Sequence, residues 1–157
     1  MISAIDACRV PAGRLRGAGV DLLDQQRFAL AARRTGPAWL RRIFDDAEWA
    51  AASVAATPEC EQLPGTAELA RLARLFGIKE CVVKVVRGLP AGACYRDIIV
   101  ARAGTDGVRP IELRGELARW ADDHRVVLTG GVLPAGDALG PDLDLCWAVA
   151  TEAEAAR

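Results

Sequence analysis

The longest stretch with helical periodicity runs from about Thr66 to Val86, where apolar residues recur every three or four positions. At about 100° per residue, they fall into two stripes on different sides of the helix. One stripe holds Leu69, Leu72, Ala73, Phe76 and Val83, and the other holds Leu75, Ile78, Val82 and Val86. A surface helix has one apolar stripe, so this pattern predicts a long helix that is covered on two faces.

Glu80 falls inside the first of these stripes, and Lys84 lies at its edge one turn later. We therefore expect Glu80 to be at least partly buried. A buried carboxylate has to be paired, hydrogen-bonded or bound to a cation, because desolvating an isolated charge is costly. Two explanations stay open from the helix alone. One is an i,i+4 ion pair with Lys84, worth about 0.2–0.5 kcal/mol when exposed, and the other is a metal or catalytic role.

The N-terminal half of the chain predicts one strand and three shorter helices. Residues 1–14 have no clean periodicity and predict a loose terminus. A strand is expected over 15–22 and a helix over 27–33, which stops at a Gly-Pro pair. Two short helices follow over 38–44 and 45–56, the second with acidic residues at its start, where they suit the helix dipole.

Beyond the long helix the apolar period changes to two, which predicts strands. Two strands joined by a glycine-rich turn form a hairpin, a short helix follows, and two further strands are separated by a long Gly/Pro-rich connection. The expected ranges are strands 94–102 and 108–115, helix 115–123, strand 125–129, connection 130–142 and strand 143–151. The chain therefore predicts an α+β fold, with a small antiparallel sheet packed on a long central helix in a single domain over 1–157.

Charge and cysteine usage narrow the class of protein. The chain has 157 residues with 20 Lys and Arg against 21 Asp and Glu, so no global charge favours nucleic acid or a membrane. Five cysteines without a CxxC pair, and no long apolar leader, predict a reduced cytoplasmic protein. The single histidine, His124, excludes a His-rich zinc site. One Arg-rich stretch, 31–44, is either a solvated helix flank or a local basic patch.

Several short motifs occur in a fixed order along residues 15 to 115. They are "GAGVD" followed by "RF", then "WLRRIFDDAEW", "FGIKECVVK", "YRDIIV" and "GVRP". This succession resembles the holo-acyl-carrier-protein synthase group of 4'-phosphopantetheinyl transferases, whose patterns are GxDxxxxxR, FxxKExxxK, a W/F-x-D-I strand and GKP. The resemblance implies that family's fold, which is typically a homotrimer with the active site between neighbouring subunits.

The resemblance also implies a set of site residues. Asp21 and Glu80 would hold Mg²⁺, which engages the pyrophosphate of coenzyme A. Mg²⁺ prefers one or two carboxylates together with water and phosphate oxygens, so the chemistry is compatible. Lys84 and Glu80 would be catalytic, with Lys84 meeting the attacked phosphate or assisting proton transfer. Lys79 would contact phosphate or an acidic neighbour. Arg27, Trp39 and Arg42 match positions that dock an acidic carrier protein.

The chain departs from the family pattern where coenzyme phosphates are contacted. In the family's V-S-x-S/T-H strand, Val127 stands for the serine and Gly130 for the histidine, and only Thr129 is kept. The family's Arg-Phe pair becomes Leu75-Phe76, with Arg74 one position earlier. We expect Arg74, Thr129 and Lys79 to be the remaining coenzyme contacts. Two alternatives stay open for the 130–142 connection: it supplies substitute contacts through backbone N–H groups, or it closes the pocket.

The implied function is Mg²⁺-dependent transfer of 4'-phosphopantetheine from coenzyme A to a serine of an acyl or peptidyl carrier protein, in fatty-acid or polyketide metabolism. Two alternatives stay open because of the departures. One is a carrier-binding accessory subunit that transfers nothing, and the other is a repurposed enzyme acting on a carrier-bound acyl group.

Overall fold

A computed structural model describes residues 13–52, 63–134 and 140–153 of the chain. Its centre is a five-stranded sheet of order β1-β5-β4-β3-β2, in which all neighbouring pairs are antiparallel. The strands are β1 (Leu15–Asp24), β2 (Ile98–Val100), β3 (Arg109–Leu113), β4 (Val126–Pro134) and β5 (Leu143–Glu152). The helices are α1 (Gln25–Thr35), α2 (Pro37–Ile43), α3 (Asp46–Ala51), α4 (Thr66–Val85) and α5 (Gly115–His124), with a 3-10 turn η1 (Tyr95–Asp97).

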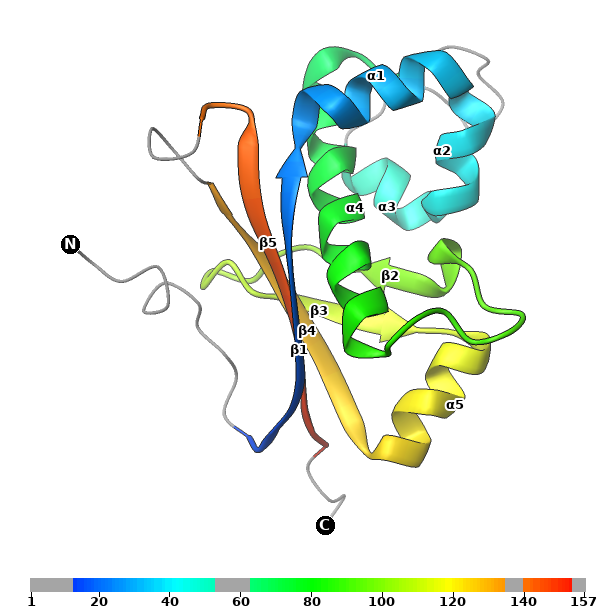
Figure 1. Ribbon diagram of the computed structural model, residues 1–157, viewed down its shortest axis with the longest axis vertical. Helices are drawn as coiled ribbons and strands as arrows, with labels where there is room; N and C mark the ends of the chain where they lie inside the picture. The colour runs from blue at the N-terminus through cyan, green and yellow to red at the C-terminus, as the bar shows by residue number, and fades with distance from the viewer. Residues whose placement is uncertain (1–12, 53–62, 135–139, 154–157) are drawn as a thin grey trace, which may run out of the picture.

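Helix α4 lies between two layers of the molecule. One side packs on β1 and β5, and the other is covered by α1, α2, α3 and β2, as Figure 1 shows. Ile78, Cys81 and Val82 in its middle are fully buried. The expectation of a helix covered on two faces is confirmed, and elements of the same chain supply the cover.

Gly19 allows β1 to lie directly against α4. A Cβ at this position would overlap the carbonyl oxygen of Cys81, which is backbone and cannot rotate away. Gly17, two residues earlier, faces the same way, with Val85 3.3 Å from the place of its Cβ. The close approach sets the distance between the end of β1 and the middle of α4, which carry Asp21 and Glu80.

Two aspartates begin the helices that follow β1. The Asp24 carboxylate accepts a hydrogen bond from the Arg27 amide and begins α1. Asp45 begins α3 in a reciprocal cap, in which its carboxylate accepts from the Ala47 amide and the Glu48 carboxylate accepts from the Asp45 amide. These caps fix the residues at which α1 and α3 begin.

The predicted elements are largely confirmed, with three corrections. Residues 95–97, expected within a strand, form η1, because the Asp97 carboxylate accepts from the Cys94 amide and closes a turn. Strand β4 continues to Pro134, so residues 130–134 pair with β5 and are not part of a loop. At the N-terminus, the Arg14 carbonyl accepts from the Glu152 amide. The rest of the expected loose terminus, residues 1–12, and residues 53–56 of the third helix lie outside the described residues.

In the three described segments, no helix is long and apolar enough to cross a bilayer.

Candidate active site

Asp21 and Glu80 line one cleft of about 470 Å³ although 58 residues separate them in the sequence. Asp21 comes from β1 and Glu80 from the middle of α4, and α1 and α2 form the opposite wall with Arg27 and Trp39. Glu80 is half-buried, as expected from its place in the apolar stripe. Convergence of two carboxylates in a cleft is the arrangement expected for a cation site.

Lys84 of α4 forms an ion pair with Asp21 of β1. Its Nζ donates to Asp21 Oδ1 at 2.7 Å and to the Val20 carbonyl at 2.6 Å. The hydrogen bond to Asp21 raises the pKa of Lys84 above the usual lysine value, so the ammonium group stays charged at neutral pH. Lys84 therefore pairs with Asp21 on the facing strand, whereas the i,i+4 explanation assigned it to Glu80.

Tyr95 holds Glu80 from the other side. The Tyr95 hydroxyl donates to Glu80 Oε1 at 2.5 Å, and its ring packs on Phe76 with 5.6 Å between centroids. Burial and then this hydrogen bond to the carboxylate raise the pKa of Tyr95 well above its usual value. Tyr95 thus remains a neutral donor throughout the physiological range.

The two carboxylates fit a hard divalent cation. Within the described residues, no hydrogen bond or ion pair involves Asp21 Oδ2 or Glu80 Oε2. The same residues contain no group of three or more His, Cys, Asp or Glu side chains that could enclose a metal. A site with two carboxylates suits Mg²⁺, which keeps several water ligands and shares phosphate oxygens with a substrate, and does not suit a structural zinc ion.

No protein-family model matches the chain. A holo-acyl-carrier-protein synthase from Frankia alni is 36% identical over 105 residues, which cover 67% of this chain and 74% of that protein. The chain belongs to the holo-acyl-carrier-protein synthase family. The prediction of a 4'-phosphopantetheinyl transferase-like enzyme is confirmed. The predicted α+β fold is confirmed as well.

Solved structures of holo-acyl-carrier-protein synthases share the fold. The enzyme from Neisseria meningitidis aligns with a TM-score of 0.66 and 20% identity, covering 88% of this chain and 99% of that chain. The Helicobacter pylori synthase, solved in complex with coenzyme A, aligns with a TM-score of 0.61 and 15% identity over 85% of this chain and 99% of that one. The likeness covers the sheet and the long helix, on which Asp21 and Glu80 lie.

Lys79, next to the site in sequence, does not face the cleft. It is fully buried, and its Nζ donates to Glu48 Oε2 at 2.7 Å, to the Ile43 carbonyl at 2.8 Å and to the Tyr95 carbonyl at 2.9 Å. Burial lowers the pKa of Lys79, and the Glu48 carboxylate opposes that shift. All three N–H donors are used inside the protein. The prediction that Lys79 contacts phosphate is therefore corrected. The alternative prediction, an acidic neighbour, is the one that the structure shows, and that neighbour is Glu48.

Arg74 lies in a second cleft, of about 380 Å³, that is rich in arginine. Its Nε donates to the buried Asp144 at 2.8 Å, and its side chain remains 43% exposed. Arg71, Arg102 and Arg109 line the same cleft. Burial, followed by the charges of Arg74 and Arg102, lowers the pKa of the Arg109 guanidinium. A cleft lined by several guanidinium groups favours the binding of an anion.

Three of these four arginines, Arg71, Arg102 and Arg109, were not predicted from the sequence. Arg109 stands at the lysine position of the GKP motif, which was a usable signal. No signal in the sequence pointed to Arg71 and Arg102. They line the same cleft as Arg109 only because α4 packs beside the β2–β3 turn in the folded chain.

Thr129 does not reach either cleft within one chain. It pairs with Val149 on the sheet face that points away from α4, whereas Gly130 points toward α4. A Cβ at position 130 would lie 2.8 Å from Ile78 Cγ2, so the position of the family's histidine is closed by packing. The Thr129 hydroxyl is buried without a hydrogen-bond partner among the described residues. Val127 is 52% exposed on the same outer face.

The predicted carrier-docking residues lie on α1 and α2. Arg27 and Arg42 are exposed, and Arg27 borders the cleft with Asp21 and Glu80. Trp39 is half-buried, because its ring packs on Phe28 and Phe76 at centroid distances of 5.5 and 6.3 Å. Trp39 is thus part of the wall between docking surface and cleft.

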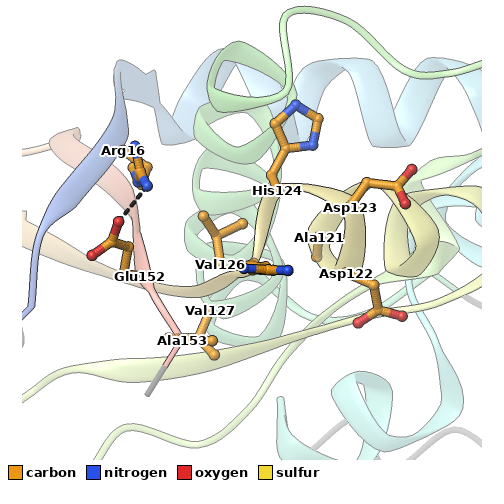
Figure 2. Close-up of a pocket in the computed structure, with 10 residues that line it drawn as sticks. Arg16, Ala121, Asp122, Asp123, His124, Val126, Val127, Glu152 and Ala153 are labelled. Atoms are coloured by element: carbon orange, nitrogen blue, oxygen red, sulfur yellow. Dashed lines mark hydrogen bonds and ion pairs between the residues drawn. The ribbon is translucent and has the colours of Figure 1, made fainter. Parts of the chain in front are cut away.

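A third cavity, of about 880 Å³, lies away from these residues. It is bounded by the end of α5, the start of β4 and the ion pair between Arg16 and Glu152, drawn as a dashed line in Figure 2. His124 lies at its edge, stacked on Trp120 at the end of α5. Val127, at the position of the family's serine, lines this cavity, whereas Asp21 and Glu80 line another cleft.

Proposed function

We propose that this protein transfers the 4'-phosphopantetheine group of coenzyme A to a serine of an acyl carrier protein, with Mg²⁺ held by Asp21 and Glu80. The observation that carries the proposal is that these two carboxylate residues line one cleft, with a charged lysine paired to Asp21. When bound, Mg²⁺ neutralises charge on the pyrophosphate of coenzyme A. The single domain over 1–157 is proposed as the catalytic unit.

Lys84 and Glu80 are the proposed catalytic residues. In the transfer, the serine oxygen forms a bond to the β-phosphorus of coenzyme A, and the bond from that phosphorus to the bridging oxygen of 3',5'-ADP breaks. The ammonium of Lys84 is charged at neutral pH, so it stabilises negative charge on the phosphoryl group and does not act as a base. Glu80 accepts the serine proton, and its place in the cleft supports that role.

The arginine cleft is the proposed site for the phosphorylated nucleotide end of coenzyme A. Arg74, Arg102 and Arg109 supply fixed positive charge there. Charge-assisted contacts to phosphate are worth about 1.5–3 kcal/mol each, so the cleft offsets the loss of the family's serine and histidine. Thr129 remains a proposed contact only for a coenzyme bound against a neighbouring subunit.

Helices α1 and α2 form the proposed docking surface for the carrier. Arg27, Arg33, Arg34 and Arg42 are exposed there, together with Leu30 at 58% exposure, and α1 contains no acidic residue. Carrier proteins are acidic, so complementary charge favours encounter and orientation. The half-buried ring of Trp39 lies between this surface and the cleft.

A homotrimer is the proposed assembly, and the uncovered sheet face supports it. Helices α1 to α5 of the described segments lie on one side of the sheet in Figure 1. On the other face Val20, Leu22 and Val127 are 59%, 52% and 52% exposed. An apolar face of this kind is typical of an interface. The cytoplasm is the proposed compartment, because Cys81, Cys94 and Cys146 are free thiols.

The test is mass spectrometry of an apo-acyl carrier protein incubated with the protein, Mg²⁺ and coenzyme A. The proposal expects the phosphopantetheine mass increment on the carrier serine. Glu80→Gln and Asp21→Asn are expected to reduce the rate by at least about 100-fold, because each removes a cation ligand. Asp122→Asn, at a residue of α5 that does not line the cleft of Asp21 and Glu80, is the matched control and should leave the rate unchanged.

One observation favours a second candidate, a carrier-binding subunit without transfer activity. Strand β4 lacks the serine and histidine of the family strand, with Val127 exposed on the outer face and Gly130 closed by Ile78 on the face toward α4. In that case the carrier protein binds to this protein, but the mass of the carrier stays unchanged at every coenzyme A concentration. A mass change only when the carrier already bears an acyl group would instead indicate a repurposed enzyme.

A further inference from the structure

Tyr95 is fixed at three points around the candidate cation site. Its carbonyl accepts from Lys79 Nζ at 2.9 Å, its ring packs on Phe76, and its hydroxyl donates to Glu80 Oε1 at 2.5 Å. Lys79 is itself clamped by the buried Glu48 at 2.7 Å. The hydroxyl of Tyr95 is therefore placed by the core and not by a mobile loop.

Glu80 depends on this hydroxyl for its orientation. It is half-buried and, of its two carboxylate oxygens, only Oε1 has a hydrogen bond among the described residues. A glutamate side chain has three rotatable torsions, so an unrestrained carboxylate in a cleft samples several directions. Fixing Oε1 against Tyr95 leaves Oε2 as the oxygen available to a ligand in the cleft.

We propose that Tyr95 is a positioning residue that orients Glu80 for the divalent cation, acting through the hydroxyl–carboxylate hydrogen bond. This inference rests on the proposed metal-dependent function. Outer hydrogen-bond partners of metal-binding carboxylates contribute about 10–100-fold to metal affinity. Tyr95 contacts neither coenzyme nor carrier serine in this role.

Tyr95→Phe isolates the hydroxyl, because it keeps the ring on Phe76 and the carbonyl that accepts from Lys79. The readout is Mn²⁺ binding to the protein alone, measured as free Mn²⁺ by electron paramagnetic resonance without coenzyme or carrier. We expect the dissociation constant to rise about 10-fold. With coenzyme and carrier present, KM for Mg²⁺ should rise by a similar factor while kcat at saturating Mg²⁺ stays close to that of the wild type.

A double-mutant comparison separates positioning from a general structural effect. In the Glu80→Gln background, Tyr95→Phe should cause no further change in Mn²⁺ binding, because the oriented carboxylate is already absent. Arg96→Lys, at the next residue of η1, is the matched control and should bind Mn²⁺ like the wild type.

The outcomes distinguish this inference from the proposed function. Equal or tighter Mn²⁺ binding by Tyr95→Phe overturns the positioning role alone, since the hydroxyl would then be neutral or a competitor of the cation. Absence of Mn²⁺ binding by the wild type overturns both the positioning role and the metal part of the proposed function.

Discussion

Lys79 and Glu80 are consecutive residues of α4, and both form hydrogen bonds with Tyr95, one with its main-chain carbonyl and the other with its hydroxyl. Lys79 Nζ donates to the Tyr95 carbonyl at 2.9 Å, and Glu80 Oε1 accepts from the Tyr95 hydroxyl at 2.5 Å. Successive residues of a helix point about 100° apart, so Lys79 enters the core while Glu80 borders the cleft. The buried ion pair and the candidate cation site are therefore joined through one residue, by its main-chain carbonyl and its side-chain hydroxyl.

Lys79→Met tests how much the buried pair contributes to stability. Removing the ammonium leaves the Glu48 carboxylate, 1% exposed, without its charge partner. We expect the free energy of unfolding to fall by about 3–5 kcal/mol, measured by urea denaturation. Lys84→Met, at a lysine that is 48% exposed, is the matched control and should cost less than about 1 kcal/mol. Equal losses in the two variants would contradict the structural role of Lys79.

The spacing of residues on α4 could be predicted from sequence, but the identity of the buried charge could not. Periodicity put Glu80 within an apolar stripe and predicted partial burial, which the structure bears out. The same spacing gave no reason to bury Lys79, because its partner Glu48 lies 31 residues earlier. The W/F-x-D-I pattern predicted an aromatic ring at Tyr95 and gave no sign of its hydroxyl bond to Glu80.

The end of β4 was misread for a related reason. Gly130 and Gly131 look like loop residues in a sequence. In the structure both are strand residues with no room for a side chain: a Cβ would meet Ile78 at position 130 and the Trp147 indole at position 131. Glycine that permits close packing and glycine that permits a turn are indistinguishable until the facing element is known.

Gly19→Ala tests the contact between β1 and α4. The added methyl group would overlap the Cys81 carbonyl, so the strand and helix have to move apart. We expect a loss of about 1–3 kcal/mol in urea denaturation, together with weaker Mn²⁺ binding because Asp21 moves away from Glu80. Ala18→Ser, at an exposed neighbour, should change stability by less than about 0.5 kcal/mol. A fully stable Gly19→Ala protein would show that this close approach is not required.

Asp45 should make stability depend on pH in the acid range. Its pKa is lowered below 3.8: burial acts to raise it, and the hydrogen bonds from the Ala47 amide and the Arg114 guanidinium outweigh that effect. A depressed carboxyl pKa contributes stability above the unfolded value, and the contribution disappears as the pH falls through the folded value.

The measurement compares wild type with Asp45→Asn by urea denaturation between pH 7 and about pH 3. The amide still accepts from Ala47 but carries no charge for Arg114. We expect the variant to be about 1 kcal/mol less stable at pH 7 and the difference to shrink toward the acid end. Asp46→Asn, at an adjacent residue that is 79% exposed, should show no such trend. A difference between wild type and Asp45→Asn that stays constant over the whole pH range would rule out linkage at Asp45.

Arg42→Glu tests the proposed docking surface. Arg42 is exposed on α2 and is not among the residues that line the cleft. Reversing its charge should weaken binding of an acidic carrier protein about 10-fold, mainly through a slower association rate, as surface plasmon resonance would measure. The loss should diminish as salt is raised, because charges on the rim of an interface are screened. Arg119→Glu, at a 75% exposed arginine on α5, supplies the same change in net charge away from the surface. If both variants lose affinity equally, net charge and not the α1–α2 surface governs carrier binding.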